Sequence, residues 1–260
     1  MIKKLRNDAH FNSKRWLLYK EFMPELSQEQ FETAVGMVLG DASVQNRGKH
    51  AHIKFEQGKE QKSFLYHLFE IFKQYTFMEF PGKRIDRKIK AKDNKIERTI
   101  LEERNDTETV KSYWFKTFSH RSFTKICHLF YFDNAGIANN SCPACKKSSL
   151  LKTRGKKKSI SFDLVNNFLT PRVFAYWVMC DGSLDRNKKI LILHIQSFSF
   201  EENVLLTISL NRKFNLNCEV ITHKKKYYVI KIPGESANLV RGLLIPYLIP
   251  SMLYKLPKAT

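Results

Sequence analysis

Residues 31–41 read Phe-Glu-Thr-Ala-Val-Gly-Met-Val-Leu-Gly-Asp, and residues 171–181 read Pro-Arg-Val-Phe-Ala-Tyr-Trp-Val-Met-Cys-Asp. In the first stretch, apolar side chains recur at the spacing of one helical face, and the second follows the same plan with a proline suited to a first helical turn. Each stretch ends in an aspartate, Asp41 or Asp181, which is followed by a small residue and a polar turn. The chain of 260 residues therefore contains an internal repeat, with one copy of the pattern in each half.

The segments that follow the two aspartates also match. Alternating apolar and polar side chains predict strands, and longer spacings predict helices after them. The expected strands are 50–56 and 189–196, with a second strand pair clearest in 218–232; the expected helices are 62–75, 123–130, 202–214 and 236–248. The pattern predicts an α+β fold of two pseudo-symmetric halves, each with the order α-β-β-α-β-β-α.

The expected organisation has four parts. Residues 1–27 form a basic N-terminal extension, 28–132 the first half, 133–158 a linker with an insertion, and 159–260 the second half. The first half also contains a basic stretch, about 80–108, that has no counterpart in the second half and is expected to be an insertion.

The two aspartates end their helices at matching positions of the repeat. Gly36 and Gly40 lie four residues apart, on one helical face, and would allow a close approach of the two helices that sets Asp41 opposite Asp181. An aspartate at a helix C-terminus faces the negative end of the helix dipole, which costs about 0.3–1 kcal/mol. Two such placements suggest a cation as partner, whereas the simpler interpretation is two core helices with aspartates near their caps.

The net charge of the chain limits the classes of partner that it would bind. The chain carries 45 Lys+Arg against 25 Asp+Glu, a formal charge of +20, and 43% hydrophobic residues, a composition of globular proteins. Such a charge favours a polyanion, nucleic acid or an anionic membrane surface, although an A+T-rich gene, as in an organelle, would also enrich lysine. No apolar run is long enough to span a membrane, and the N-terminus has no apolar stretch of a secretory signal.

The five cysteines are scattered, which argues for a reducing compartment and against a disulfide framework. Cys142 and Cys145 have the Cys-x-x-Cys spacing of half a zinc site, which Cys127 or His128 could complete. The sequence contains no second pair of this spacing.

The two repeated stretches resemble a known family. Gly36-Met-Val-Leu-Gly-Asp41 and Ala175-Tyr-Trp-Val-Met-Cys-Asp181-Gly182 are similar to the two motifs of single-chain LAGLIDADG homing endonucleases. Further similarity lies in 169–177, 196–201, 213–218 and 245–257. Tyr176 stands where the family motif usually has glycine, which would loosen the helix crossing on that side.

The resemblance implies a fold and a site. Motif helices would form the interface between the halves, and two antiparallel sheets would form a saddle along the major groove of DNA. The implied metal ligands are Asp41, Asp181 and the main-chain oxygens of Gly40 and Cys180, and the implied metal is Mg²⁺, with Mn²⁺ as a substitute. A basic residue beside each motif would complete the catalytic set, and these positions fall on Lys158 and Lys255.

Further candidates surround that site. Glu56 and Gln196 follow their motif aspartates at the same spacing, and they could order waters around the metal or be strand-end polar residues on a DNA-facing surface. The basic residues expected to contact DNA are Arg47, Lys49, His52, Lys54, Lys88, Lys90, Lys188, Lys224 and Lys226.

The resemblance therefore implies a monomeric, Mg²⁺-dependent endonuclease that makes a double-strand break in a long asymmetric DNA target and so initiates intron homing. The alternatives on the same fold are an RNA maturase that assists splicing of intron RNA and a DNA-binding protein that does not cleave. No membrane partner is expected. The expected location is a mitochondrion or another organelle, with synthesis inside the organelle because the sequence shows no transit peptide.

Overall fold

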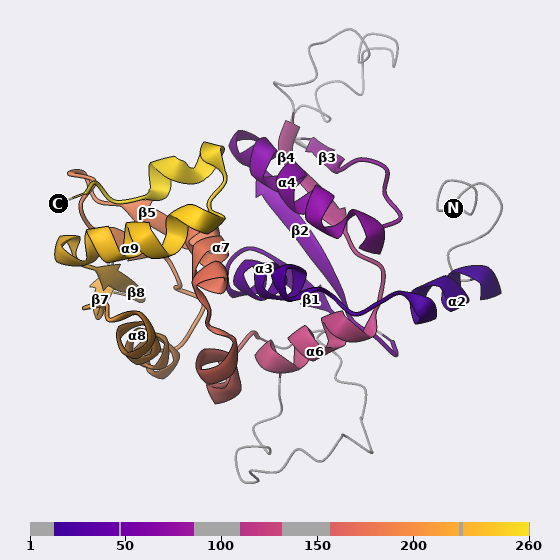
Figure 1. Ribbon diagram of the computed structural model, residues 1–260, viewed down its shortest axis with the longest axis horizontal. Coiled ribbons are helices and arrows are strands. Elements are labelled where there is room, and N and C mark those ends of the chain that lie inside the picture. The colour runs from indigo at the N-terminus through magenta and orange to yellow at the C-terminus, as the bar shows by residue number, and fades with distance from the viewer. Residues whose placement is uncertain (1–12, 47, 86–109, 132–156, 224–225, 260) are drawn as a thin grey trace, which may run out of the picture. The chain divides into compact units, whose positions relative to one another are not determined.

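The computed structural model describes residues 13–46, 48–85, 110–131, 157–223 and 226–259 (Figure 1). The first half of the repeat contains α3 (Gln28–Leu39), β1 (Ser43–Gln45), β2 (His52–Gly58), α4 (Lys62–Phe72), β3 (Gly82–Ile85), β4 (Val110–Lys116) and α6 (Arg121–Phe130). The second contains α7 (Pro171–Asp181), β5 (Gly182–Leu184), β6 (Leu191–Leu193), α8 (Phe200–Phe214), β7 (Glu219–His223), β8 (Tyr227–Ile232) and α9 (Ala237–Leu244). The predicted α+β order is confirmed in both halves.

Shorter elements flank this repeat. Helix α2 (Lys14–Phe22) precedes the first half, and a π-helical turn, η5 (Leu164–Phe168), precedes α7. The chain ends in two 3₁₀ segments, η7 (Ile245–Tyr247) and η8 (Pro250–Lys255). Within the described ranges, no helix is long and apolar enough to cross a membrane.

Each half contributes one antiparallel sheet of four strands. The strand orders are β1-β2-β4-β3 and β5-β6-β8-β7, so the topology repeats strand for strand. The edge strand β3 occupies Gly82–Ile85, inside the stretch 80–108 that was expected to be an insertion, so the repeated fold continues through residue 85. Residues 86–109 lie outside the described part of the chain.

The chain divides into two compact units, Lys54–Phe118 and the combination of Met1–Ile53 with Ser119–Thr260. The smaller unit has an aromatic core, in which the Phe55 ring stacks on Phe115 of β4 and Phe72 of α4 at centroid distances of 4.7 and 5.0 Å. The larger unit contains both motif helices. The half boundaries expected from the sequence remain a prediction, because the compact units divide the first half between them.

The motif helices α3 and α7 pack side by side in the larger unit (Figure 1). Glycine makes this approach possible. A Cβ atom at Gly36 would lie 2.6 Å from the Val173 carbonyl oxygen and 2.8 Å from the Tyr176 Cβ, and one at Gly40 would lie 2.4 Å from the Cys180 Cβ. The close crossing predicted from Gly36 and Gly40 is confirmed, and the Tyr176 side chain is buried beside it.

Both motif helices have well-defined starts. Ser27 accepts a hydrogen bond from the Gln30 amide, and the Gln30 side chain accepts one from the Ser27 amide, which forms a capping box. Thr170 caps α7 by accepting from the Val173 amide, and Pro171 occupies the first helical turn. These caps fix the register of both helices and therefore the positions of their C-terminal aspartates.

An arginine clamps the N-terminal ends of the pair. The Arg172 guanidinium of α7 lies 2.6 Å from Glu29 and 3.5 Å from Glu32 of α3, and it stacks over the Tyr247 ring at 4.8 Å. The side chain is only 23% exposed, so this ion pair is better shielded from solvent than most surface pairs. The helix pair is thus held by glycine packing along its length and by charge at one end.

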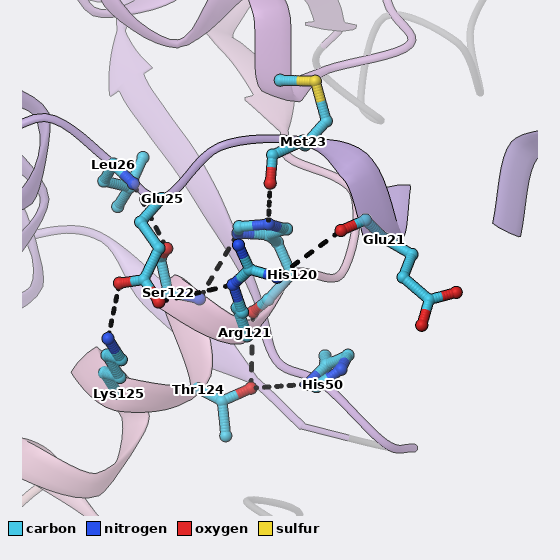
Figure 2. A network of polar contacts seen from close by, with 10 residues as sticks. All are labelled: Glu21, Met23, Glu25, Leu26, His50, His120, Arg121, Ser122, Thr124 and Lys125. Carbon is cyan, nitrogen blue, oxygen red and sulfur yellow. Dashed lines mark hydrogen bonds and ion pairs between the residues drawn. The ribbon is translucent and has the colours of Figure 1, made fainter. Parts of the chain in front are cut away.

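The segment that leads into α3 is anchored to α6 by a polar network (Figure 2). His120, the N-cap of α6, accepts from the Ser122 amide at Nδ1 and therefore donates from Nε2 to the Met23 carbonyl. Glu25 pairs with Lys125 and Arg121 of α6 at 2.5 and 3.3 Å. The stretch expected to be an extension, 1–27, is therefore joined to the first half where it is described.

Candidate active site at the ends of the paired helices

The repeat brings the two motif aspartates together. Asp181 is the last residue of α7, and Asp41 follows the C-cap of α3. A Cβ atom built on Gly40 would lie 3.5 Å from the Asp181 carboxylate oxygen Oδ2, so the end of α3 adjoins that carboxylate. The opposed placement expected from the sequence is what the helix pair produces.

The environment of Asp181 favours a cation. Burial and the negative charge of Asp41 raise the pKa of Asp181 to about 7, and the positive charges of Lys158 and Lys255 oppose this shift only in part. Two carboxylates in one site disfavour each other's ionisation, and a bound cation removes that cost. The pair therefore has the electrostatics of a metal site.

Each helix end also receives a lysine. The Lys158 ammonium donates 2.8 Å hydrogen bonds to the carbonyl oxygens of Val38 and Gly40 at the end of α3. The Lys255 ammonium donates to the carbonyl oxygens of Met179 and Cys180 at the end of α7, at 2.5 and 2.9 Å. In both halves the lysine therefore contacts the carbonyl group of the residue directly before the motif aspartate.

Of these two lysines, Lys255 is buried and Lys158 is half-buried. Burial lowers the pKa of both ammonium groups, and the nearby Asp41, Asp181 and Cys180 act in the opposite direction. Helix C-termini present unpaired carbonyl groups and a negative dipole end, which ammonium groups satisfy. The cation that the two aspartate positions suggested is thus supplied in part by the protein itself.

The donor set fits a hard divalent cation such as Mg²⁺, which takes oxygen ligands and uses few carboxylates. Asp41 and Asp181 supply carboxylates, and a carbonyl oxygen with two lone pairs can accept from lysine and still face a metal. No group of three or more His, Cys, Asp or Glu side chains gathers as a metal cage among the residues that the structure describes. The arrangement suits an ion that keeps part of its shell for water and substrate.

The Cys180 thiol is an unsuitable ligand. Burial, followed by the charges of Asp41 and Asp181, raises the pKa of the Cys180 thiol well above its usual range. Its sulfur lies 3.5 Å from the Met37 sulfur, between the two motif helices. Only the main-chain oxygen of Cys180 therefore suits the expected role.

The predicted outer-shell residues have different surroundings. Glu56 lies in the smaller compact unit, where Lys54, Ser112 and Arg84 all donate hydrogen bonds to its carboxylate. Gln196 is exposed after β6 in the larger unit. For both residues the water-ordering role stays a prediction.

The predicted DNA-contacting residues are partly outside the described structure. Those in the described part are Lys49, Lys188 and Lys226, which are exposed, and His52 and Lys54, which are half-buried. Those outside it are Arg47, Lys88, Lys90 and Lys224, together with the possible zinc ligands Cys142 and Cys145.

The sequence interpretation missed His194, a neighbour of Asp181, and Ser183, which contacts His194. The amide of His194 donates to the Asp181 carbonyl oxygen at 3.0 Å, and the His194 Nε2 lies 2.6 Å from the Ser183 hydroxyl. The available signal was position, because Ser183 lies in the first strand after the motif, β5, and His194 directly follows the second, β6. Strand register decides which of such residues meet, and the sequence alone did not supply it.

Comparison with protein families matches residues 31–142 and 147–240 to the LAGLIDADG DNA endonuclease family. The chain belongs to this family. The first matched segment covers α3 from residue 31 onward and the second contains α7, so both aspartates of the site lie within the matched segments.

Individual proteins similar to this chain support the same family membership. The chain is 42% identical over 149 residues, 57% of its length and 96% of the relative's, to the probable intron-encoded DNA endonuclease 3 of Mycosarcoma maydis. It is 33% identical to the probable intron-encoded endonuclease 1 of Wickerhamomyces canadensis, covering 94% of this chain and 91% of the relative. A solved structure of the homing endonuclease I-WcaI bound to its DNA recognition sequence matches with 30% identity and a TM-score of 0.75, covering 100% and 99% of the two chains.

Proposed function

We propose that this chain is a site-specific DNA endonuclease that cuts both strands of a long target and initiates homing of the intron that encodes it. One observation carries the proposal: Asp41 and Asp181 meet at the paired ends of α3 and α7, each preceded by a carbonyl group to which a lysine ammonium donates a hydrogen bond. Family membership and relatives named as intron-encoded endonucleases support the same activity. A single chain supplies both halves of the site, so it acts as a monomer.

The two aspartates would hold Mg²⁺, with Mn²⁺ as a substitute, and the main-chain oxygens of Gly40 and Cys180 would complete the protein's share of the ligands. When bound, the metal activates water and stabilises the leaving 3′ oxygen. Lys158 and Lys255 place fixed positive charge at each helix end, where negative charge develops on a phosphate during cleavage. Because the arrangement occurs twice, each strand of the duplex meets one aspartate and one lysine.

The charge of the chain fits a duplex substrate. Its excess of 20 positive charges would neutralise phosphates, and the counterions released make such binding strongly salt-dependent. The exposed lysines Lys49, Lys188 and Lys226 would contribute to this surface. The expected location is a mitochondrion, in keeping with the intron-encoded relatives and with an excess of lysine that an A+T-rich gene would give.

Cleavage of the intron-lacking allele tests the proposal. Purified protein is incubated with target DNA and Mg²⁺, beside the variants Asp41→Asn and Asp181→Asn. We expect wild-type protein to make a double-strand break, and each variant to lose at least about 100-fold in rate while it still binds the target. Asp163→Asn, an exposed aspartate before η5, is the matched control and should cut like wild type.

The same assay separates the alternatives. A splicing assay with the intron RNA runs in parallel. If the protein cleaves no target but still assists splicing of the intron RNA, the endonuclease proposal is wrong and the protein is a maturase. If the protein binds a DNA target specifically but does not cleave it with any divalent ion tested, it is a DNA-binding protein without nuclease activity.

A further inference from the structure

The open face of the sheet in the smaller compact unit carries a carboxylate with three donors. Glu56 of β2 accepts from the Lys54 ammonium at 2.5 Å, from the Ser112 hydroxyl at 2.7 Å and from the Arg84 guanidinium at 2.9 Å. Phe55 points to the opposite face, where it stacks on Phe72 of α4. Because side chains alternate along a strand, Glu56 and Lys54 project away from α4.

Strand register explains how the cluster assembles. Glu56 pairs with Trp114 of β4, Trp114 pairs with Gly82 of β3, and Ser112 pairs with Arg84. The donors thus come from three adjacent strands and flank Glu56 on its own face of the sheet: Ser112 and Arg84 lie level with Gly58, two residues after Glu56, and Lys54 lies two residues before it. Ser112 and Arg84 are 56 and 28 residues away from Glu56 in the chain, so the sheet alone brings them to it.

Both cations of the cluster are held in place. The Lys54 ammonium lies 5.7 Å from the Trp114 ring centroid as well as against Glu56. The Trp114 ring in turn covers Gly82, where a Cβ atom would come within 2.8 Å of it. Arg84 is bound at one terminal nitrogen, Nη1, while its side chain is 56% exposed. A guanidinium held at one nitrogen can present its other donors outward.

A carboxylate on this face needs a reason, because a surface that meets phosphates gains nothing from negative charge. Burial alone would raise the pKa of Glu56, but hydrogen bonds from Lys54, Ser112 and Arg84 lower it to about 2. The group is therefore charged at any physiological pH, and it lowers the attraction of the face for DNA backbone. The Glu56 carboxylate instead orients the two cations Lys54 and Arg84.

We propose that Glu56 is a positioning residue for sequence readout, which orients Arg84 and Lys54 toward base edges and makes Arg84 a specificity-determining residue. The inference rests on the proposed function and replaces the water-ordering role suggested for Glu56. An arginine in the major groove reads guanine through two hydrogen bonds, whereas an arginine on a phosphate carries no sequence information, so the orientation of Arg84 decides which contact it makes.

The described residues at the equivalent positions of the second half form a different arrangement. His194 and Gln196 follow Asp181 at the spacings at which Lys54 and Glu56 follow Asp41. Gln196 is neutral and exposed, and His194 bonds to Ser183 instead. The two halves thus present different groups at equivalent positions, as an asymmetric target requires, and Gln196 is a matched control.

The test measures binding without cleavage, in Ca²⁺, to the target and to a panel of targets with one base pair changed. Arg84→Ala and Arg84→Lys should each lose roughly 5- to 150-fold of discrimination at one or two neighbouring base pairs. Glu56→Gln should lose discrimination at those same base pairs while its affinity for unrelated DNA rises, because two cations lose their partner. The double variant Glu56→Gln/Arg84→Ala should lose little more than Arg84→Ala alone.

Several results would overturn the inference. Unchanged discrimination in Arg84→Ala, an exposed substitution that should not disturb folding, would remove Arg84 from readout. A slower cut by Glu56→Gln with discrimination unchanged would return Glu56 to the metal site. Gln196→Ala should leave the base pairs read by Arg84 unaffected, and equal losses at all positions would indicate misfolding in place of readout. If the wild-type protein binds no DNA target specifically, the proposed function itself is wrong, and this result is obtained before any variant is compared.

Discussion

The Lys158 ammonium donates a 2.8 Å hydrogen bond to the carbonyl oxygen of Gly40, the residue before the motif aspartate Asp41. The Lys255 ammonium makes the corresponding bond to the Cys180 carbonyl before Asp181. Each lysine thus serves two purposes, because it completes the C-terminus of a motif helix and brings positive charge to the site. This double role makes the first prediction one about stability as well as activity.

Replacing either lysine by methionine should destabilise the protein. Lys158→Met and Lys255→Met keep the length of the side chain but leave two helix carbonyl groups without their donor, which costs about 1–3 kcal/mol each. Urea unfolding measures the change, with Lys157→Met and Lys258→Met as controls at exposed neighbouring positions. If the lysines acted only on substrate, all four variants would unfold like wild type.

Adding a methyl group should have opposite effects at two helical glycines, one at the crossing of α3 with α7 and one in α9. Gly36→Ala places a Cβ atom 2.6 Å from the Val173 carbonyl oxygen, and overpacking of this kind costs about 1–3 kcal/mol. Gly242→Ala lies in α9, with nothing within 4 Å of the new atom, and should stabilise by about 0.4–1 kcal/mol. Thermal unfolding of both variants checks the signs, and a neutral Gly36→Ala would contradict the close approach of α3 and α7.

The polar network at α6 should make stability depend on pH. Burial lowers the pKa of His120, although the Met23 carbonyl acts in the opposite direction. The unfolded chain therefore binds a proton at higher pH than the native one. The contribution of neutral His120 to the free energy of unfolding is fully present above pH 7 and is lost as the pH drops through 6.5. His120→Asn can still cap the helix but does not titrate, and we expect a flatter profile of unfolding free energy between pH 7 and 5.

The exposed His128, on the same helix, provides the control for that measurement. His128→Asn should retain the wild-type pH profile. A profile that is equally steep in His120→Asn and in wild type would place the titrating group elsewhere.

Removing one motif carboxylate should stabilise the protein in the absence of metal. Asp181→Asn abolishes a half-buried charge beside Asp41, and a gain of about 1 kcal/mol would raise Tm by roughly 2–4 °C in a chain of this size. Mg²⁺ should raise the Tm of wild-type protein but not of the variant, because ligand binding to the native state adds stability. Scanning calorimetry in EDTA and in Mg²⁺ gives both values, and an equal response to Mg²⁺ would place the metal outside this pair.

The sequence predicts the repeat, the helix pair and its glycines because these depend on local spacing. It also indicates Asp41 and Asp181, since acidic residues at two matching helix ends are unusual. Resemblance to the family added Lys158 and Lys255, which spacing alone would not select among consecutive lysines.

Long-range register accounts for what the sequence did not predict. The three donors of Glu56 come from three strands, and no local pattern indicates that Arg84 and Ser112 face it. The clamp of Arg172 on Glu29 joins residues 143 positions apart. Strand β3 went unrecognised because its charged residues resemble the basic stretch that follows, although a charged edge strand is common in sheets.

The position of Lys158 has a consequence for building hybrids from two such enzymes. This residue completes helix α3, which lies 118 residues earlier, yet it stands just before the elements of the second half. A chimera joined anywhere between residues 132 and 157 would take the donor for its first motif helix from the other parent. Recombined proteins should therefore exchange their halves after residue 158, so that each motif helix travels with its own lysine.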